Sequence, residues 1–204
     1  HGRLLRVLEK QPPQSGKDLR LYLDLDLQRV AAEALGEQRG AVVALDPLNG
    51  GVLAMVSNPS YDANLFVEGI SYSAYGALRN SMDTPLLNRA VQGQYPPGST
   101  VKPLLALGGL SRDFITTTTT VRDPGWYRIP GDDRRYRDWT LRVRGGGHAE
   151  QVDMRMAIAE SCDTYYYDLA YRMGIDTMAD VLKPFGLGRT TGIDTTGEQG
   201  GILP

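Results

Sequence analysis

A serine and a lysine three positions apart, Ser99 and Lys102, are the residues of this sequence best placed to do chemistry. They stand in the stretch Tyr-Pro-Pro-Gly-Ser-Thr-Val-Lys-Pro, residues 95–103. The prolines and glycine before the serine favour a loop, and serine is preferred at a helix start, so a helix is predicted to open at Ser99. Three positions are about one helical turn, which places Lys102 on the same face as Ser99.

This spacing suits nucleophilic catalysis. A hydroxyl is a weak nucleophile that needs a base within hydrogen-bond reach, and the amine of Lys102 could be that base if it is kept neutral. A helix N-terminus adds partial positive charge and free N–H groups, which favour negative charge developing on an attacked carbonyl. The structural alternative is a serine N-cap followed by an exposed lysine, because any Ser-x-x-Lys is common by chance.

A second pair of reactive residues, Ser161 and Asp163, falls within a long predicted helix over residues 154–173 or at a break in it. Two positions apart, they cannot share a helix face, so we expect a local turn that presents Ser161 toward Ser99. Ser161 could then relay a proton between Lys102 and the leaving amine, while Asp163 orients the lysine or the substrate. The structural alternative is that both side chains bond to nearby backbone.

The rest of the sequence predicts a mixed α/β chain. Two nearly continuous apolar runs, residues 40–46 and 52–57, flank an Asn-Gly pair, which predicts a hairpin in the middle of a sheet covered by helices on both sides. Other periodicities predict a half-buried strand over 18–24, helices over 26–37, 73–78, 88–92 and 176–185, a helix end at Gly174, and a long ragged region over 112–150.

Composition excludes several classes of protein. The net charge of −2 over 204 residues does not indicate a nucleic-acid partner. No run of eighteen apolar residues is present, so nothing in this chain is expected to span a membrane. The single cysteine, Cys162, excludes an internal disulfide. The start, His1-Gly2-Arg3, is typical of a truncated or cloned terminus.

The two motifs together resemble one family. Ser-x-x-Lys, Ser-Asp-Asn and Lys-Thr-Gly are the signature of class A β-lactamases and penicillin-binding proteins. From about residue 3 to 204 the chain is similar to class B penicillin-binding protein transpeptidases, most of all to the elongation-type enzymes of Gram-negative bacteria. The resemblance rests on four segments, residues 40–65, 88–90, 95–103 and 191–194.

The resemblance implies an α/β (α+β) penicillin-binding/serine β-lactamase-like fold, a central antiparallel sheet flanked by helices, with its C-terminal part missing from this chain. Residues 1–23 would then be the end of a pedestal or linker region with the first strand, and residues 24–204 an incomplete transpeptidase domain.

The implied reaction is D,D-transpeptidation of peptidoglycan. The penultimate D-Ala carbonyl of a stem peptide would acylate Ser99, D-Ala would leave, and an amine of a neighbouring stem would attack the acyl-enzyme. β-Lactams would acylate the same serine. Asp163 stands where many relatives have Asn, and should keep a hydrogen-bonding role.

By the same resemblance, the chemistry needs no cofactor. The partners would be stem peptides, a SEDS-family glycosyltransferase and other elongation-complex proteins. The protein would work at the periplasmic face of the bacterial inner membrane, with the anchor outside this chain.

A third family motif, Lys-[Ser/Thr]-Gly, is absent from these 204 residues. Arg189-Thr190-Thr191-Gly192 follows a predicted helix end and lies in a segment that the family places away from the site, and Ser15-Gly16-Lys17 has the wrong order. We therefore expect the chain to stop within the domain and to be inactive toward substrate on its own.

A metal site is also predicted. Cysteine, histidine and carboxylate oxygens are zinc ligands, and four of them close a structural tetrahedral site. Asp123, Asp138, His148 and Cys162 could pin the ragged 112–150 region against the helix of Ser161, as the resemblance to elongation-type relatives also implies. The alternative is a buried thiol with turn-forming aspartates.

Three other functions remain open on sequence. The first is a β-lactam sensor domain, which is acylated but does not turn over. The second is a serine β-lactamase, which the context of Ser99 and the lack of an obvious deacylating glutamate disfavour. The third is a non-enzymatic scaffold of a cell-wall complex, against which the retention of Ser99, Lys102 and Ser161 argues.

Overall fold

The structure, a computed structural model, describes residues 12, 14–67 and 69–203. Contacts between residues divide the chain into two compact units, residues 1–86 and 87–204. Each unit combines helices with short antiparallel strands. No helix in the described ranges is both long enough and apolar enough to cross a membrane.

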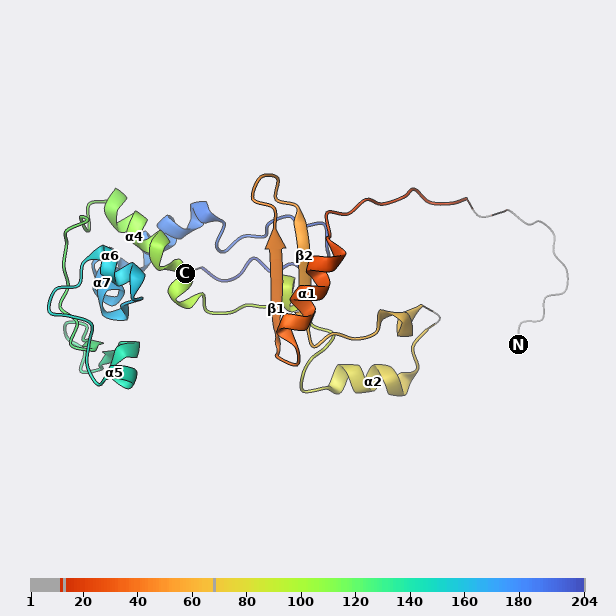
Figure 1. The fold of residues 1–204 in the computed structure, drawn as a ribbon, viewed down its shortest axis with the longest axis horizontal. Coiled ribbons are helices and arrows are strands. Elements are labelled where there is room, and N and C mark those ends of the chain that lie inside the picture. The colour runs from red at the N-terminus through yellow and green to blue at the C-terminus, as the bar shows by residue number, and fades with distance from the viewer. Residues whose placement is uncertain (1–11, 13, 68, 204) are drawn as a thin grey trace. The chain divides into compact units, whose positions relative to one another are not determined.

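The first unit is organised around a hairpin of β1 (Gly40–Leu45) and β2 (Val52–Asn58), against which α1 (Leu25–Leu35) packs (Figure 1). The predicted hairpin and the helix before it are therefore confirmed. The chain turns between the strands with Gly50 at φ +76°, a conformation that glycine adopts without strain. Burial alternates along β1, which leaves one face exposed, so in the part that the structure describes this hairpin is not covered on both faces as predicted.

The predicted strand over residues 18–24 is wrong. The described residues 14–24 are neither helix nor strand, and Leu19 and Leu21 are 88% and 65% exposed. Asp24 ends the segment by donating its N–H to the carbonyl of Leu53 at 2.9 Å and by capping α1 with its side chain. An alternating pattern forms a strand only where a neighbouring strand supplies a ladder, and this segment has none among the described residues.

The remainder of the described part of the first unit contains the helix predicted over 73–78 and a 3₁₀ turn that was not predicted. A 3₁₀ turn covers Ala63–Phe66, and α2 covers Tyr72–Asn80. The hydroxyl of Ser71 accepts the N–H of Ala74 and so caps the start of α2.

The second unit carries the residues of interest. Its predicted helix at 88–92 is present as α3, and its ragged region contains a two-stranded hairpin and a helix. Its elements are α3 (Arg89–Gln92), a 3₁₀ turn (Gly98–Val101), α4 (Lys102–Ser111), β3 (Trp126–Tyr127), β4 (Tyr136–Arg137), α5 (Trp139–Arg144), α6 (Met154–Ala159), α7 (Asp163–Leu182) and a 3₁₀ turn (Lys183–Phe185).

The core of this unit lies where α4, α6 and α7 pack together (Figure 1). Leu105 of α4 and Leu169 of α7 are buried in it. α4 approaches α7 closely because it carries two glycines: a Cβ at Gly109 would lie 3.0 Å from Leu169, and one at Gly108 would clash with Val181. These contacts join the C-terminal half of α4 to the middle and the end of α7.

Two interruptions divide the long helical stretch. α6 ends at Ala159 and α7 begins at Asp163, so the predicted helix over 154–173 is broken at the second motif. Gly174, with φ +72° and ψ 163°, interrupts α7 as predicted, and helix continues on its far side to Leu182. Gly186, in the left-handed conformation, ends the final 3₁₀ turn.

Candidate active site

Ser99 lies in the 3₁₀ turn that precedes α4, one residue after Gly98 at φ +57°. The prediction that an α-helix would open at Ser99 is therefore wrong in detail, and Ser99 is not an N-cap either: the turn has no side-chain cap, and the carbonyl of Ser99 accepts the N–H of Lys102. In a 3₁₀ turn residues three apart are eclipsed, so the two side chains leave the backbone one above the other. Because Ser99 Oγ does not cap the helix, it is available to a partner from another element.

That partner is Ser161. The break between α6 and α7 holds this residue at φ +54°, a left-handed conformation that is rare for a side chain with a Cβ. Ser161 Oγ donates to Ser99 Oγ at 2.8 Å and accepts from Lys102 Nζ at 3.0 Å. The turn predicted to present Ser161 toward Ser99 is present, and these hydrogen bonds connect Ser99 to Lys102 through the hydroxyl of Ser161.

Lys102 is buried, with 7% of its surface exposed, so the alternative of an exposed lysine behind a capping serine is excluded. Its Nζ donates to the carbonyl of Ser161 at 2.8 Å, to Ser161 Oγ at 3.0 Å and to Asp163 Oδ1 at 2.6 Å. An ammonium has three N–H donors, so each acceptor takes one. The ring centroid of Tyr166 lies 5.4 Å from the same nitrogen.

The predicted metal ligands also come together. Asp123, Asp138, His148 and Cys162 each offer one ligand atom, and these atoms all lie within 4.8 Å of one another. Three of the four residues are buried, and the side chain of His148 is fully enclosed. Two carboxylates, one imidazole and one thiol are all groups that bind zinc, and four ligands close a structural tetrahedral site.

Two of the distances between the ligand atoms match those around a tetrahedral ion. Zinc–ligand bonds of 2.0 to 2.3 Å place neighbouring donors roughly 3.3–3.7 Å apart. Cys162 Sγ is 3.6 Å from Asp123 Oδ2, and His148 Nδ1 is 3.6 Å from Asp138 Oδ1. His148 Nδ1 and Asp123 Oδ2 are closer, at 2.7 Å, because they share a hydrogen bond that an ion would replace.

The metal-ligand cluster is joined to the catalytic candidates by Asp138. Its Oδ2 accepts the N–H of Asp163 at 2.6 Å and that of Thr164 at 3.3 Å. The N-cap of α7, Cys162, makes no side-chain cap, so Asp138 from the distant loop satisfies the first N–H groups of the helix instead. The loop therefore fixes the backbone position of Asp163, which in turn holds Lys102.

Burial sets the protonation of Cys162, and hydrogen bonds set that of Asp123. Burial raises the pKa of the Cys162 thiol to about 12, and the Asp123 and Asp138 carboxylates add to the increase. Burial alone would raise the pKa of Asp123, but hydrogen bonds from His148, Thr164 and Gly125 outweigh it and keep the pKa below its ordinary value. Without a cation nearby the thiol is protonated and Asp123 is charged.

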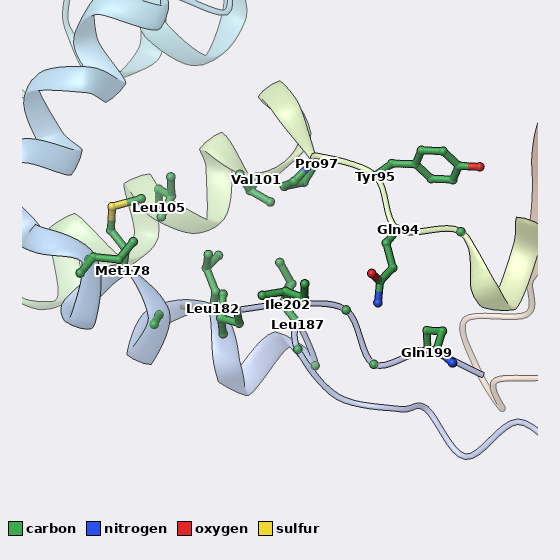
Figure 2. A pocket seen from close by; sticks show the side chains of 18 residues that line it. Gln94, Tyr95, Pro97, Val101, Leu105, Met178, Leu182, Leu187, Gln199 and Ile202 are labelled. Carbon is green, nitrogen blue, oxygen red and sulfur yellow. The ribbon is translucent and has the colours of Figure 1, made fainter. Parts of the chain in front are cut away.

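A cavity of about 460 Å³ lies beside the nucleophile turn but is not part of this site. Val101 of the 3₁₀ turn and Leu105 of α4 line one side of it, and Leu182, Leu187 and Ile202 line the other (Figure 2). None of the four catalytic candidates contributes to its lining. The candidate active site is therefore defined by the hydrogen bonds around Lys102.

The chain belongs to the penicillin-binding protein transpeptidase family: residues 40–204 match the family described as penicillin binding protein transpeptidase domain. It is 50% identical to the peptidoglycan D,D-transpeptidase MrdA of Escherichia coli over 203 residues, which are 100% of this chain and 31% of that protein. The chain thus spans about a third of its curated relatives' length.

Solved structures agree with this family. Penicillin-binding protein 2 (PBP2) of Pseudomonas aeruginosa in complex with WCK 5153 is 49% identical, with a TM-score of 0.84 over 96% of this chain and 42% of that one. PBP2 of Helicobacter pylori, solved in complex with MreC, is 35% identical, with a TM-score of 0.81 over 89% of this chain and 33% of that one. The predicted penicillin-binding transpeptidase fold and the elongation-type resemblance are confirmed.

Sequence reasoning missed the residues that hold the candidates in place. Tyr166 follows Asp163 by three positions on α7, a spacing that places both on one helix face and could have indicated a shared contact. Thr164 donates its hydroxyl to Asp123 at 2.7 Å and its N–H to Asp138. Its proximity to the second motif was the available signal, but which acids it would meet depends on how the 112–150 loop folds.

Proposed function

We propose that this chain carries the nucleophile of a peptidoglycan D,D-transpeptidase of cell elongation, which cross-links stem peptides through an acyl-enzyme on Ser99 and is the target of β-lactams. The observation that carries the proposal is the hydrogen-bonded series from Ser99 Oγ through Ser161 Oγ to the buried Nζ of Lys102. The 50% sequence identity to MrdA over the whole chain supports it.

The geometry supports a two-serine proton relay. In the arrangement described, Lys102 donates to Ser161, and Ser161 donates to Ser99. For attack both bonds reverse: Ser99 gives its proton to Ser161, which passes its own proton to a neutral Lys102. Ser99 Oγ then bonds to the carbonyl carbon, the C–N bond breaks, and the leaving amine receives the proton back through Ser161. Asp163 holds the lysine throughout, since its carboxylate lies 2.6 Å from Nζ.

The test uses the E. coli relative with its matching 203 residues replaced by this chain, hereafter the MrdA chimera. Incubated with a stem pentapeptide and an amine acceptor, it should release D-Ala and form the cross-linked product. Ser99→Ala and Lys102→Ala should abolish both products, whereas Lys183→Ala, which removes a half-exposed lysine outside the site, should not. Covalent labelling by penicillin without any product would favour the sensor alternative, and rapid loss of the label by hydrolysis would favour a β-lactamase.

We also propose that Asp123, Asp138, His148 and Cys162 hold a structural Zn²⁺. The closed, mixed donor set and its near-tetrahedral spacing support this. Bound there, the ion would hold the ragged loop against the start of α7 and would take no part in the acyl transfer. The alternative is a metal-free cluster in which a His148–Asp123 hydrogen bond and a protonated Cys162 fill the same space.

We propose residues 24–204 as the part that belongs to the transpeptidase domain and residues 1–23 as the end of a preceding pedestal or linker. The family match from residue 40 and the packing of α1 on β2 support this boundary.

For the whole protein we propose stem peptides as substrates, with a SEDS-family glycosyltransferase and other elongation-complex proteins as partners, at the periplasmic face of the inner membrane. A relative solved with MreC supports an elongation-complex setting. Co-purification of the MrdA chimera with MreC, against the wild-type relative as control, would test it.

A further inference from the structure

One group around Lys102 has no part in the proton relay: the aromatic ring of Tyr166. Its centroid lies 5.4 Å from Lys102 Nζ, within the range of a cation–π contact. Tyr166 is only 5% exposed, so the contact is shielded from water, where such an interaction is strongest. The ring of Tyr165 packs edge-on against it, with centroids 5.5 Å apart, and restricts where it can move.

The three hydrogen-bond acceptors of Lys102 all come from residues 161–163. Tyr166 extends from the next turn of α7, and the nitrogen lies over its aromatic ring. Hydrogen bonds to one short segment fix the distance of the nitrogen from that segment. They do not prevent the long lysine side chain from changing rotamer where there is space for it. A large buried ring beside the nitrogen removes that space.

The ring of Tyr166 contacts Lys102, whereas its hydroxyl makes no hydrogen bond to any described residue. This hydroxyl is the only buried side-chain polar atom without a hydrogen-bond partner within the described residues. A buried phenol normally makes a hydrogen bond, and this one makes none in the part of the chain that the structure describes. Hydrogen bonding by the hydroxyl therefore does not explain why a tyrosine occupies this position. The ring is the part of the side chain that contacts the lysine.

We propose that Tyr166 is a positioning residue, whose ring holds Lys102 Nζ within hydrogen-bond reach of Ser161 Oγ and keeps water from it. The inference rests on the proposed role of Lys102 as the base. Small displacements of a catalytic group are costly, on the order of 10²-fold for about 1 Å. The ring therefore contributes to the rate of acylation without touching the substrate.

The kinetic test compares two substitutions in the MrdA chimera. Tyr166→Phe keeps the ring and should leave the acylation rate constant for a β-lactam within about twofold of the parent. Tyr166→Leu removes the ring and should lower that rate constant roughly tenfold or more, while the dissociation constant of the non-covalent complex stays unchanged. In a Lys102→Ala background the Leu substitution should have no further effect, because the residue through which the ring acts is gone.

Loss of fold is controlled by Leu169→Ala, which changes another buried side chain of α7, one that packs against Gly109 of α4, seven positions from Lys102. It should reduce thermal stability without changing the acylation rate constant. An unchanged rate in Tyr166→Leu, an equal loss in Tyr166→Phe, or the same loss with Lys102 absent would each overturn the proposal.

A second readout does not depend on acylation. Lysines can be labelled with an amine-reactive reagent and the sites quantified by peptide mapping, with the half-exposed Lys183 as internal reference. Tyr166→Leu should raise the labelling rate of Lys102 several-fold relative to Lys183, and Tyr166→Phe should not. If the parent chimera is not acylated at Ser99, the proposed function fails, whereas equal Lys102 labelling in all three proteins refutes the role of the ring.

Discussion

The hydroxyl of Ser161 donates a hydrogen bond to the hydroxyl of Ser99 across 2.8 Å, and it does so from a residue held at φ +54°. A left-handed residue with a Cβ costs about 1–2 kcal/mol, so this turn is not the most stable way to join α6 to α7. The same turn directs the carbonyl of Ser161 to Lys102 Nζ at 2.8 Å. Strain at this position is therefore tied to an arrangement in which one residue contacts both the nucleophile and the base.

Replacing Ser161 by alanine or by glycine should separate stability from chemistry. Both changes remove the relay hydroxyl, so in the MrdA chimera each should slow acylation by about 10²–10⁴-fold. Glycine also relieves the left-handed strain, so Ser161→Gly should be more stable than Ser161→Ala by about 1 kcal/mol. Acylation kinetics of the two variants measure the loss of rate, and their unfolding in denaturant measures the difference in stability. Rapid acylation in either variant would show that the proton from Ser99 takes another route.

Asp163 should be more tolerant of asparagine than of alanine. Asn keeps an oxygen that can accept from Lys102, so Asp163→Asn should retain acylation within about tenfold. Asp163→Ala leaves one N–H of a buried ammonium without a partner, which should cost about 1–3 kcal/mol of stability and displace the base. Acylation rates and unfolding midpoints of the two variants test this. Equal losses of acylation rate in the two variants would mean that holding Lys102 requires the negative charge of Asp163.

Much of this site and of the fold could be predicted because the signals are local. The Ser99–Lys102 spacing, the β1–β2 hairpin and the break near Ser161 all follow from residues within a few positions of each other. The 3₁₀ start of α4 could not be predicted, since serine at a helix start normally indicates a cap. Here the serine side chain bonds to a residue 62 positions away, and a single sequence does not contain that contact.

Hydrogen bonds between backbone groups and side chains far away in the sequence could not be predicted either. The cap of α7 comes from Asp138, 25 residues before Asp163, through a loop with little regular structure. The false strand over residues 18–24 has the same origin, because its alternating pattern was correct for a strand but no partner strand lies beside it in the described part of the chain. In both cases the missing information was which distant segment lies alongside.

Zinc binding should be stoichiometric and depend on Cys162. Metal-replete MrdA chimera should contain one more zinc than a Cys162→Ala variant by elemental analysis, and chelation should lower its melting temperature. Asp132→Asn, which changes an aspartate of the same loop outside the cluster, is the matched control and should keep the metal. Equal zinc content in the parent and the Cys162 variant would refute the site.

Alkaline pH should destabilise the protein partly through Tyr127. Burial, with help from the nearby carboxylate of Asp168, raises the pKa of Tyr127 from its ordinary 10 to about 12. The unfolded chain gives up this proton first, so the associated stability is complete below pH 10 and is lost as the pH rises toward 12. The loss should be on the order of 1–2 kcal/mol after screening by solvent.

Tyr127→Phe isolates this effect, because phenylalanine has no proton to lose. Between pH 8 and pH 12, chosen to bracket the shift, the variant should lose less free energy of unfolding than the parent. Urea titrations at both pH values measure the difference. An identical loss in the two proteins would mean that Tyr127 ionises alike in the folded and unfolded states.

The 204-residue chain on its own should not react with substrate or be labelled fully by a fluorescent penicillin. It has no Lys-[Ser/Thr]-Gly segment, which in its family completes the site beside the two motifs found here. The MrdA chimera places the same residues within a full-length relative and should be labelled. Full labelling of the isolated chain would show that Ser99, Lys102 and Ser161 suffice for acylation.

The most direct test of the central claim is the intact mass of the MrdA chimera after incubation with a β-lactam, followed by peptide mapping of the adduct. A gain of one drug mass, located on Ser99 and absent from Ser99→Ala, is the predicted result. An adduct on any other residue, or an adduct that persists in Ser99→Ala, would contradict it.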